Sequence, residues 1–106
     1  MTQAEIIAAI AAIRGAELAP SKFAADRSAV HLGGAEIAHP EGEGVDVRLS
    51  RARLLAAGLP HSALMDCRKD WTLLDPIPIS ADHLRSIVQA FASGAVTPPT
   101  SKRTRR

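Results

Sequence analysis

The strongest constraint on the fold is a pair of adjacent glycines, Gly33 and Gly34, inside the apolar segment 28–38. Two successive glycines supply the positive φ angles of a type I′ turn, which joins two antiparallel strands. Such a turn fixes three cross-strand pairs: Leu32 with Ala35, His31 with Glu36, and Val30 with Ile37. Apolar side chains then share one face of the hairpin, and an imidazole meets a carboxylate on the other. The segment therefore predicts an antiparallel hairpin that turns one face to a core.

A helix is predicted near each end of the chain. Thr2 and Glu5 have the spacing of a capping box, and isoleucines follow at helical spacing, so residues 3–16 should form the first helix. Ser80 is a suitable N-cap for the last helix, which Gly94 ends. Its apolar residues recur three and four positions apart: Leu84, Ile87, Val88 and Phe91. Each helix thus presents one apolar stripe to a core.

The middle of the chain predicts short strands around a short helix. Residues 40–44 form a turn, and apolar and polar residues alternate over 45–49, which is typical of a half-buried strand. Ser50 can cap a helix over 51–57. Segments 61–65 and 71–74 are two further candidate strands, joined by a turn over 66–70.

These elements predict the fold class. A chain of 106 residues normally forms one domain. Strands joined by tight turns are antiparallel, because parallel neighbours need long crossover connections. A helical stripe must pack against another element, and one face of a small sheet provides it. We therefore expect a single two-layer α+β domain over residues 1–94, a small antiparallel sheet with the N- and C-terminal helices packed on one face.

Basic residues are concentrated at the C-terminus. The chain has 13 Lys and Arg residues and 11 Asp and Glu residues, and four of the bases lie in 95–106: Lys102, Arg103, Arg105 and Arg106. Residues 1–94 keep 9 bases against 11 acids, a net charge of −2. We expect 95–106 to be a disordered tail. It could contact anions or nucleic acid weakly and in a salt-sensitive way, or serve solubility alone.

Several classes of protein are excluded or disfavoured. A single cysteine, Cys67, rules out an internal disulfide framework. Neither a membrane-spanning apolar run nor a secretion signal is recognisable, so we expect a cytoplasmic protein without membrane contact. Trp71 is the only tryptophan, and we expect it to fill the core, because aromatic residues at 3 % are too few for a surface that stacks nucleic-acid bases.

Two of the four histidines have no predicted chemistry. His31 should form a surface ion pair with Glu36, and His83 lies in the first turn of the last helix. His39 has the parity of Ile37, so it should point toward the core side at the end of its strand.

His39 and His61 form the candidate site. If they met beside Asp46 or Asp66, they could bind a metal or move protons. The chain has no metal-ligand spacing that supports this, so no metal and no cofactor is predicted. The alternative is that both histidines are partly buried and bonded to backbone groups.

A family resemblance supports the same positions. The runs 34–39 (GAEIAH), 45–50 (VDVRLS) and 57–61 (AGLPH), followed by Asp70 and Trp71, resemble the small uncharacterised domains called the luciferase domain. The family-like positions are His39, Asp46, His61 and Trp71. Asp70 replaces a usual glycine, and Glu41 lies where a second histidine is usual, which argues against a metal. The chain is more distantly similar to proteins of the MmcQ/YjbR type, some of which are described as DNA-binding.

Three hypotheses follow. The first is a non-enzymatic binding or interaction domain of unknown partner that resembles the luciferase-domain group. The second is a nucleic-acid-associated protein that uses the basic tail. The third is a small enzyme that uses His39 and His61 with a carboxylate, and it requires their side chains to converge in one pocket.

Overall fold

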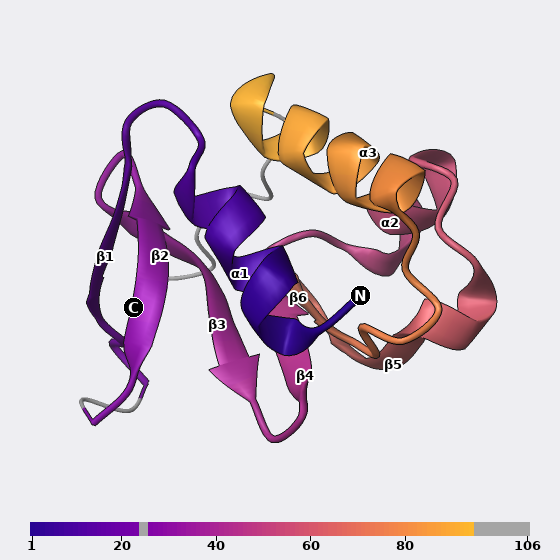
Figure 1. Ribbon diagram of the computed structural model, residues 1–106, viewed down its shortest axis with the longest axis horizontal. Helices are drawn as coiled ribbons and strands as arrows, with labels where there is room; N and C mark the ends of the chain where they lie inside the picture. Colours follow the sequence, from indigo (N-terminus) through magenta and orange to yellow (C-terminus); the bar gives the residue numbers. More distant parts are fainter. Residues whose placement is uncertain (24–25, 95–106) are drawn as a thin grey trace.

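The computed structural model describes residues 1–23 and 26–94 (Figure 1). Its elements are α1 (Gln3–Ala11), β1 (Ala16–Pro20), β2 (Ser28–Leu32), β3 (Ala35–Glu41), β4 (Gly44–Val47), α2 (Arg51–Ala56), the short 3-10 helix η1 (His61–Ala63), β5 (Leu64–Arg68), β6 (Trp71–Leu74) and α3 (Ala81–Ala92). Among these residues, no helix has the length and apolar character needed to cross a membrane. The predicted tail 95–106 lies outside the described residues.

The strands form one antiparallel sheet in the order β1-β2-β3-β4-β6-β5. Strands β1 to β4 pair in chain order, as short connections require. The chain then leaves the sheet through α2 and η1 and returns as the hairpin β5–β6, with β6 beside β4. Strand β4 is therefore central, and β1 and β5 are the edges.

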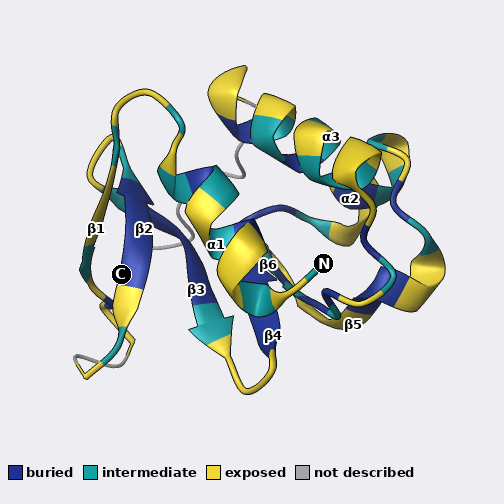
Figure 2. Cartoon of the chain, in the orientation of Figure 1, coloured by how far each residue is buried: buried dark blue, intermediate teal, exposed yellow. Residues whose placement is uncertain are grey.

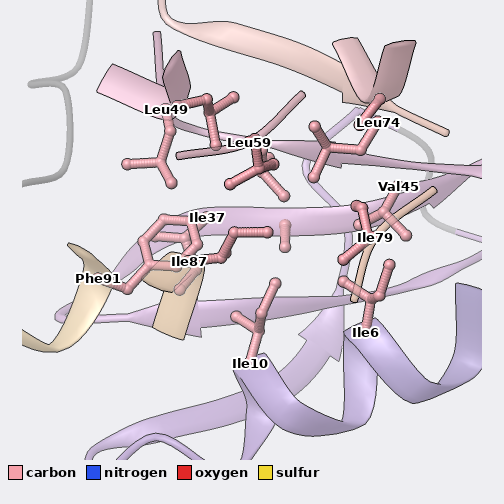
Figure 3. Packing of buried hydrophobic residues seen from close by; sticks show 14 of the residues in the cluster. Ile6, Ile10, Ile37, Val45, Leu49, Leu59, Leu74, Ile79, Ile87 and Phe91 are labelled. Carbon is pink, nitrogen blue, oxygen red and sulfur yellow. The ribbon is translucent and has the colours of Figure 1, made fainter. Parts of the chain in front are cut away.

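Helices α1 and α3 pack on the same face of the sheet (Figure 1). Their outward faces are exposed, whereas the strands beneath them are mostly buried (Figure 2). The residues that fill the space between helices and sheet include Ile6 and Ile10 of α1, Ile87 and Phe91 of α3, and Ile37, Val45 and Leu74 of the strands (Figure 3). This arrangement confirms the predicted two-layer α+β fold.

Local signals for turns and caps are also confirmed. Gly33 and Gly34 have φ angles of 62° and 83°, both positive as a type I′ turn requires. Thr2 and Glu5 form the capping box of α1. Ser50 and Ser80 cap α2 and α3 through their side chains.

Several boundaries differ from the predictions. The turn predicted over 40–44 is confined to Gly42 and Glu43, because β3 continues to Glu41 and β4 begins at Gly44. Helix α1 ends at Ala11, and the chain turns at Gly15 to add β1 to the edge of the sheet, a strand that its sequence pattern did not predict. Strand β4 ends at Val47, two residues early. Residues 61–63 form η1, so β5 begins at Leu64 and the tight turn moves to Lys69 and Asp70. These boundaries depend on how each strand pairs with its neighbour, and the sequence of a single segment does not contain that information.

Candidate functional site

A β-bulge in β3 determines where His39 points. His31 pairs with Glu36 as predicted, but Val30 pairs with Ala38 and not with Ile37, so the predicted third pair is wrong. One extra residue in β3 reverses the alternation of side chains beyond it. Ile37 and Ala38 both belong to the core, and Glu36 and His39 share the opposite face.

The predicted orientation of His39 is therefore wrong. It was expected on the core side, but it pairs with Asp46 of β4, next to the core pair Ala38 and Val47. Because neighbouring residues in a strand face opposite ways, His39 and Asp46 lie on the face that α1 and α3 do not cover. Both are nevertheless buried.

A pocket opens on this second face. It has a volume of about 200 Å³ and is lined by five residues: Phe23, His39, Asp46, Arg68 and Trp71. Four strands contribute, because β3 pairs with β4, β4 pairs with β6, and the hairpin register places Arg68 of β5 opposite Trp71 of β6. Phe23 comes from the segment that follows β1. The pocket thus combines five segments of the chain, which are four strands and the residues that follow β1.

One wall of the pocket is aromatic. The ring centroids of Phe23 and Trp71 are 5.6 Å apart with the rings nearly perpendicular at 87°. The His39 ring lies 5.2 Å from Trp71 and 5.6 Å from Phe23. These separations are typical of favourable aromatic pairs. The guanidinium of Arg48 lies 6.0 Å from the Trp71 centroid, close enough for a cation–π interaction.

Beneath this wall, a buried carboxylate fixes the His39 ring. Glu36 is 2 % exposed and accepts hydrogen bonds from Ser21 Oγ at 2.9 Å and from the backbone N–H of Lys22 at 2.6 Å. Its Oε2 lies 2.8 Å from His39 Nδ1. The angle of this contact is outside hydrogen-bond geometry, so Nδ1 has an ion-pair neighbour but no hydrogen bond among the described residues.

Two more carboxylates face the other ring nitrogen. His39 Nε2 lies 3.4 Å from Asp46 Oδ2 and 3.7 Å from Glu41 Oε1. Asp46 Oδ2 also accepts a 3.0 Å hydrogen bond from Arg68, whereas its Oδ1 is buried without a partner in the described part of the chain. His39 therefore lies among three carboxylates, those of Glu36, Glu41 and Asp46.

The other predicted site histidine lies elsewhere. His61 is exposed at the start of η1, and Arg51 Nη2 lies 2.9 Å from its Nδ1. His61 does not line the pocket that contains His39. Of the four predicted site residues, the structure brings together His39, Asp46 and Trp71 but not His61.

Two further expectations need correction. His31 is buried, and its Nε2 lies 3.1 Å from the carbonyl oxygen of Pro20. It is therefore not a surface residue in an ion pair with Glu36, although the two residues are partners in the strand register. The bulge places His39 beside the Glu36 carboxylate, and Ser21 and Lys22, which follow β1, donate hydrogen bonds to it. Trp71 is only half-buried and lies on the pocket face, not in the apolar core, because its neighbours in β6, Thr72 and Leu74, take the buried positions.

Sequence reasoning missed Phe23, Glu36, Glu41 and Arg68 as members of the site. A local signal existed for one of them, since Arg68 and Trp71 flank a tight turn. Glu36 reaches His39 only through the bulge, which no short pattern indicates. Glu41 shares a face with His39 by ordinary strand alternation, but it was missed because the sequence predicted a turn over 40–44.

Comparison of the chain with protein-family models, with curated proteins and with solved structures found no match. The resemblance to the luciferase-domain group and to the MmcQ/YjbR type stays a prediction. The functional argument therefore depends on the geometry of the pocket.

Proposed function

We propose that the protein is a non-enzymatic binding domain that takes a small planar ligand into the pocket beside His39, Asp46 and Trp71. The observation that supports this proposal is the combination of an aromatic wall with a carboxylate–guanidinium pair in one hollow. Ligand sites are typically apolar concavities with a few polar groups that fix orientation.

The size of the pocket limits the ligand. Its volume of about 200 Å³ is below the roughly 300–1,000 Å³ of sites for drug-sized molecules. One aromatic ring with a short polar substituent would fill it. Phe23, whose side chain is 68 % exposed, would lose water contact when such a ring packs against it.

The polar end of the pocket indicates the substituent. Asp46 offers an acceptor, its unpartnered Oδ1, and Arg68 offers donors. A planar group that carries an N–H and a C=O side by side is complementary to such a pair. The ligand class is therefore a planar ring with an amide-like edge.

An NMR titration tests the proposal. Trp71 is the only tryptophan, so the ¹⁵N-labelled protein has a single indole N–H signal, and it reports from the pocket. Benzamide should shift this signal saturably, with a dissociation constant of about 1 mM for so small a fragment. Benzoate, the matched compound without an N–H donor, should bind at least several-fold more weakly.

Matched variants locate the binding. Asp46→Asn should weaken benzamide several-fold, and Asp82→Asn, which changes an exposed acid of α3 outside the pocket, should leave it unchanged. A shift that rises linearly without saturation, or equal behaviour of the two variants, would overturn the proposal. Titration with a short DNA duplex tests the nucleic-acid alternative. Saturable shifts of sheet residues that persist at physiological salt and without residues 95–106 would favour that alternative.

A further inference from the structure

We infer that His39, Glu41 and Asp46 form a binding site for a divalent metal ion at the floor of the pocket. This inference rests on the proposed function, because the ion would be reached through the same pocket. One ligand atom from each residue lies within 4.8 Å of the others. Two donors at about 2.1 Å from a tetrahedral ion are roughly 3.4 Å apart. The 3.4 Å and 3.7 Å separations from His39 Nε2 are close to that value.

A second observation supports the site independently of the cluster. The Asp46 side chain is only 4 % exposed, and its Oδ1 has no hydrogen-bond partner in the part of the chain that the structure describes. A buried carboxylate oxygen without a donor is costly, unless a cation or a donor outside the chain compensates it. Asp46 lines the pocket, and its other oxygen, Oδ2, is the one that lies 3.4 Å from His39 Nε2, so a cation bound between them would compensate the charge of this carboxylate.

The surroundings of His39 are those of a metal ligand. Histidines that bind metals usually direct their second nitrogen at a carboxylate or a carbonyl, which orients the ring and sets its tautomer. Glu36 lies at that nitrogen, with its Oε2 2.8 Å from Nδ1 although outside hydrogen-bond geometry, and it is itself anchored by Ser21 and Lys22. Nε2 is then the nitrogen available to an ion, and it is the one that faces Glu41 and Asp46.

The donor set indicates the kind of ion. One imidazole and two carboxylates supply nitrogen and oxygen without sulfur, a set that suits Zn²⁺ and similar first-row dications better than the all-oxygen sites of Mg²⁺. Two carboxylates and a neutral imidazole balance the charge of a dication. Three protein ligands leave a coordination position open. The C=O of the amide-like ligand proposed above could occupy it.

Two arginines form ion pairs with the carboxylates of the cluster and would compete with the metal ion for them. Arg68 contacts Asp46 at 3.0 Å, and Arg27 contacts Glu41 at 2.9 Å. The side chain of Arg68 is 65 % exposed, so its withdrawal into water costs little. Removal of Arg68 should therefore strengthen metal binding, an effect that a purely structural ion pair would not produce.

Calorimetric titration of ZnCl₂ into chelator-treated, untagged protein at neutral pH tests the site. We expect one ion per chain and much weaker binding of MgCl₂. Glu41→Gln should weaken Zn²⁺ about tenfold or more, and Arg68→Gln should strengthen it several-fold. Glu41 is half-exposed, so its variant should fold, and circular dichroism of each variant checks this.

Controls separate this site from adventitious ligands. Glu43→Gln and His61→Asn change an exposed acid and an exposed histidine outside the cluster and should leave the affinity unchanged. No measurable heat, equal effects of Glu41→Gln and Glu43→Gln, or loss of binding in His61→Asn would overturn the inference. Benzamide binding measured with a chelator present distinguishes the two proposals. If benzamide binds and Zn²⁺ does not, only the metal site is rejected. If Zn²⁺ binds and benzamide does not, only the proposed organic ligand is rejected.

Discussion

Glu36 is the residue on which the geometry of the pocket depends most. It links two parts of the pocket, because one oxygen lies beside His39 and both oxygens accept hydrogen bonds from the segment after β1. Ser21 Oγ in turn accepts a 3.1 Å hydrogen bond from the backbone N–H of Phe23. A buried carboxylate is tolerated when donors surround it, and here those donors also position an aromatic wall.

Replacement of this carboxylate by an amide should be costly. In Glu36→Gln an acceptor oxygen becomes an NH₂ group that faces donors, so we expect a loss of about 1–3 kcal/mol in the free energy of unfolding, measured with urea. Glu17→Gln, an exposed acid on the edge strand β1, should change it by less than about 0.5 kcal/mol. Equal losses in the two variants would show that Glu36 has no special role.

At the scale of elements, side-chain caps and one bulge define the boundaries and orientations. In the capping box of α1, the backbone N–H of Thr2 donates to Glu5 Oε1 at 2.8 Å, and the N–H of Glu5 donates to Thr2 Oγ1 at 3.1 Å. Caps of this kind satisfy N–H groups that a helix cannot satisfy internally. The bulge at Ile37 acts on orientation, because it turns one half of β3 over relative to the other.

The capping box makes α1 sensitive to acid. The hydrogen bond from the Thr2 backbone, followed by that from its hydroxyl, lowers the pKa of Glu5 below its ordinary value. A carboxyl group with a depressed folded pKa stabilises the folded state above its unfolded pKa, and this contribution disappears as the pH falls through the folded pKa. In Thr2→Ala the contribution of the hydroxyl is lost while the backbone N–H remains, so the pKa of Glu5 should rise part of the way toward its ordinary value. NMR titration of the Glu5 carboxyl carbon measures this, and an unchanged pKa would contradict the capping box.

At the scale of the whole molecule, the two faces of the sheet differ in kind. One face is closed by α1 and α3 over an apolar core. The other carries charged groups that are buried within the sheet itself, among them Glu36, His39, Asp46 and Arg48. The first face supplies stability through burial of apolar area, and the second presents the pocket.

Stability should therefore depend on the helix side. Ile87→Ala removes a fully buried side chain of α3 and should cost about 2–5 kcal/mol in urea unfolding. Ile77→Ala makes the same chemical change at a side chain that is 81 % exposed and should stay within about 0.5 kcal/mol. Because the total stability of such a domain is small, Ile87→Val serves as a milder variant with a loss of about 0.5–1.5 kcal/mol. Similar effects at both positions would mean that α3 does not cover the core.

Local chemistry in the sequence was sufficient to predict the helices, the hairpin and the layers. The helix caps at Thr2 and Ser80 and the turn at Gly33 and Gly34 depend on interactions within a few residues. Such local interactions can be recognised directly in the sequence. Apolar stripes then require two layers, so the fold class followed from the sequence alone. Strand β1 was not predicted, because its apolar and polar residues do not alternate and because it joins the sheet through its pairing with β2.

The tertiary structure alone decided the site. His39 faces the pocket because β3 has a bulge at the point where both Ile37 and Ala38 enter the core. No short sequence pattern predicts the position of this bulge. Trp71 lines the same pocket as Asp46 because β6 returns beside β4, whereas His61 lies outside the pocket, in η1 before β5. The physical reason is that propensity acts along the chain, whereas strand register and side-chain direction depend on packing between segments that are distant in sequence.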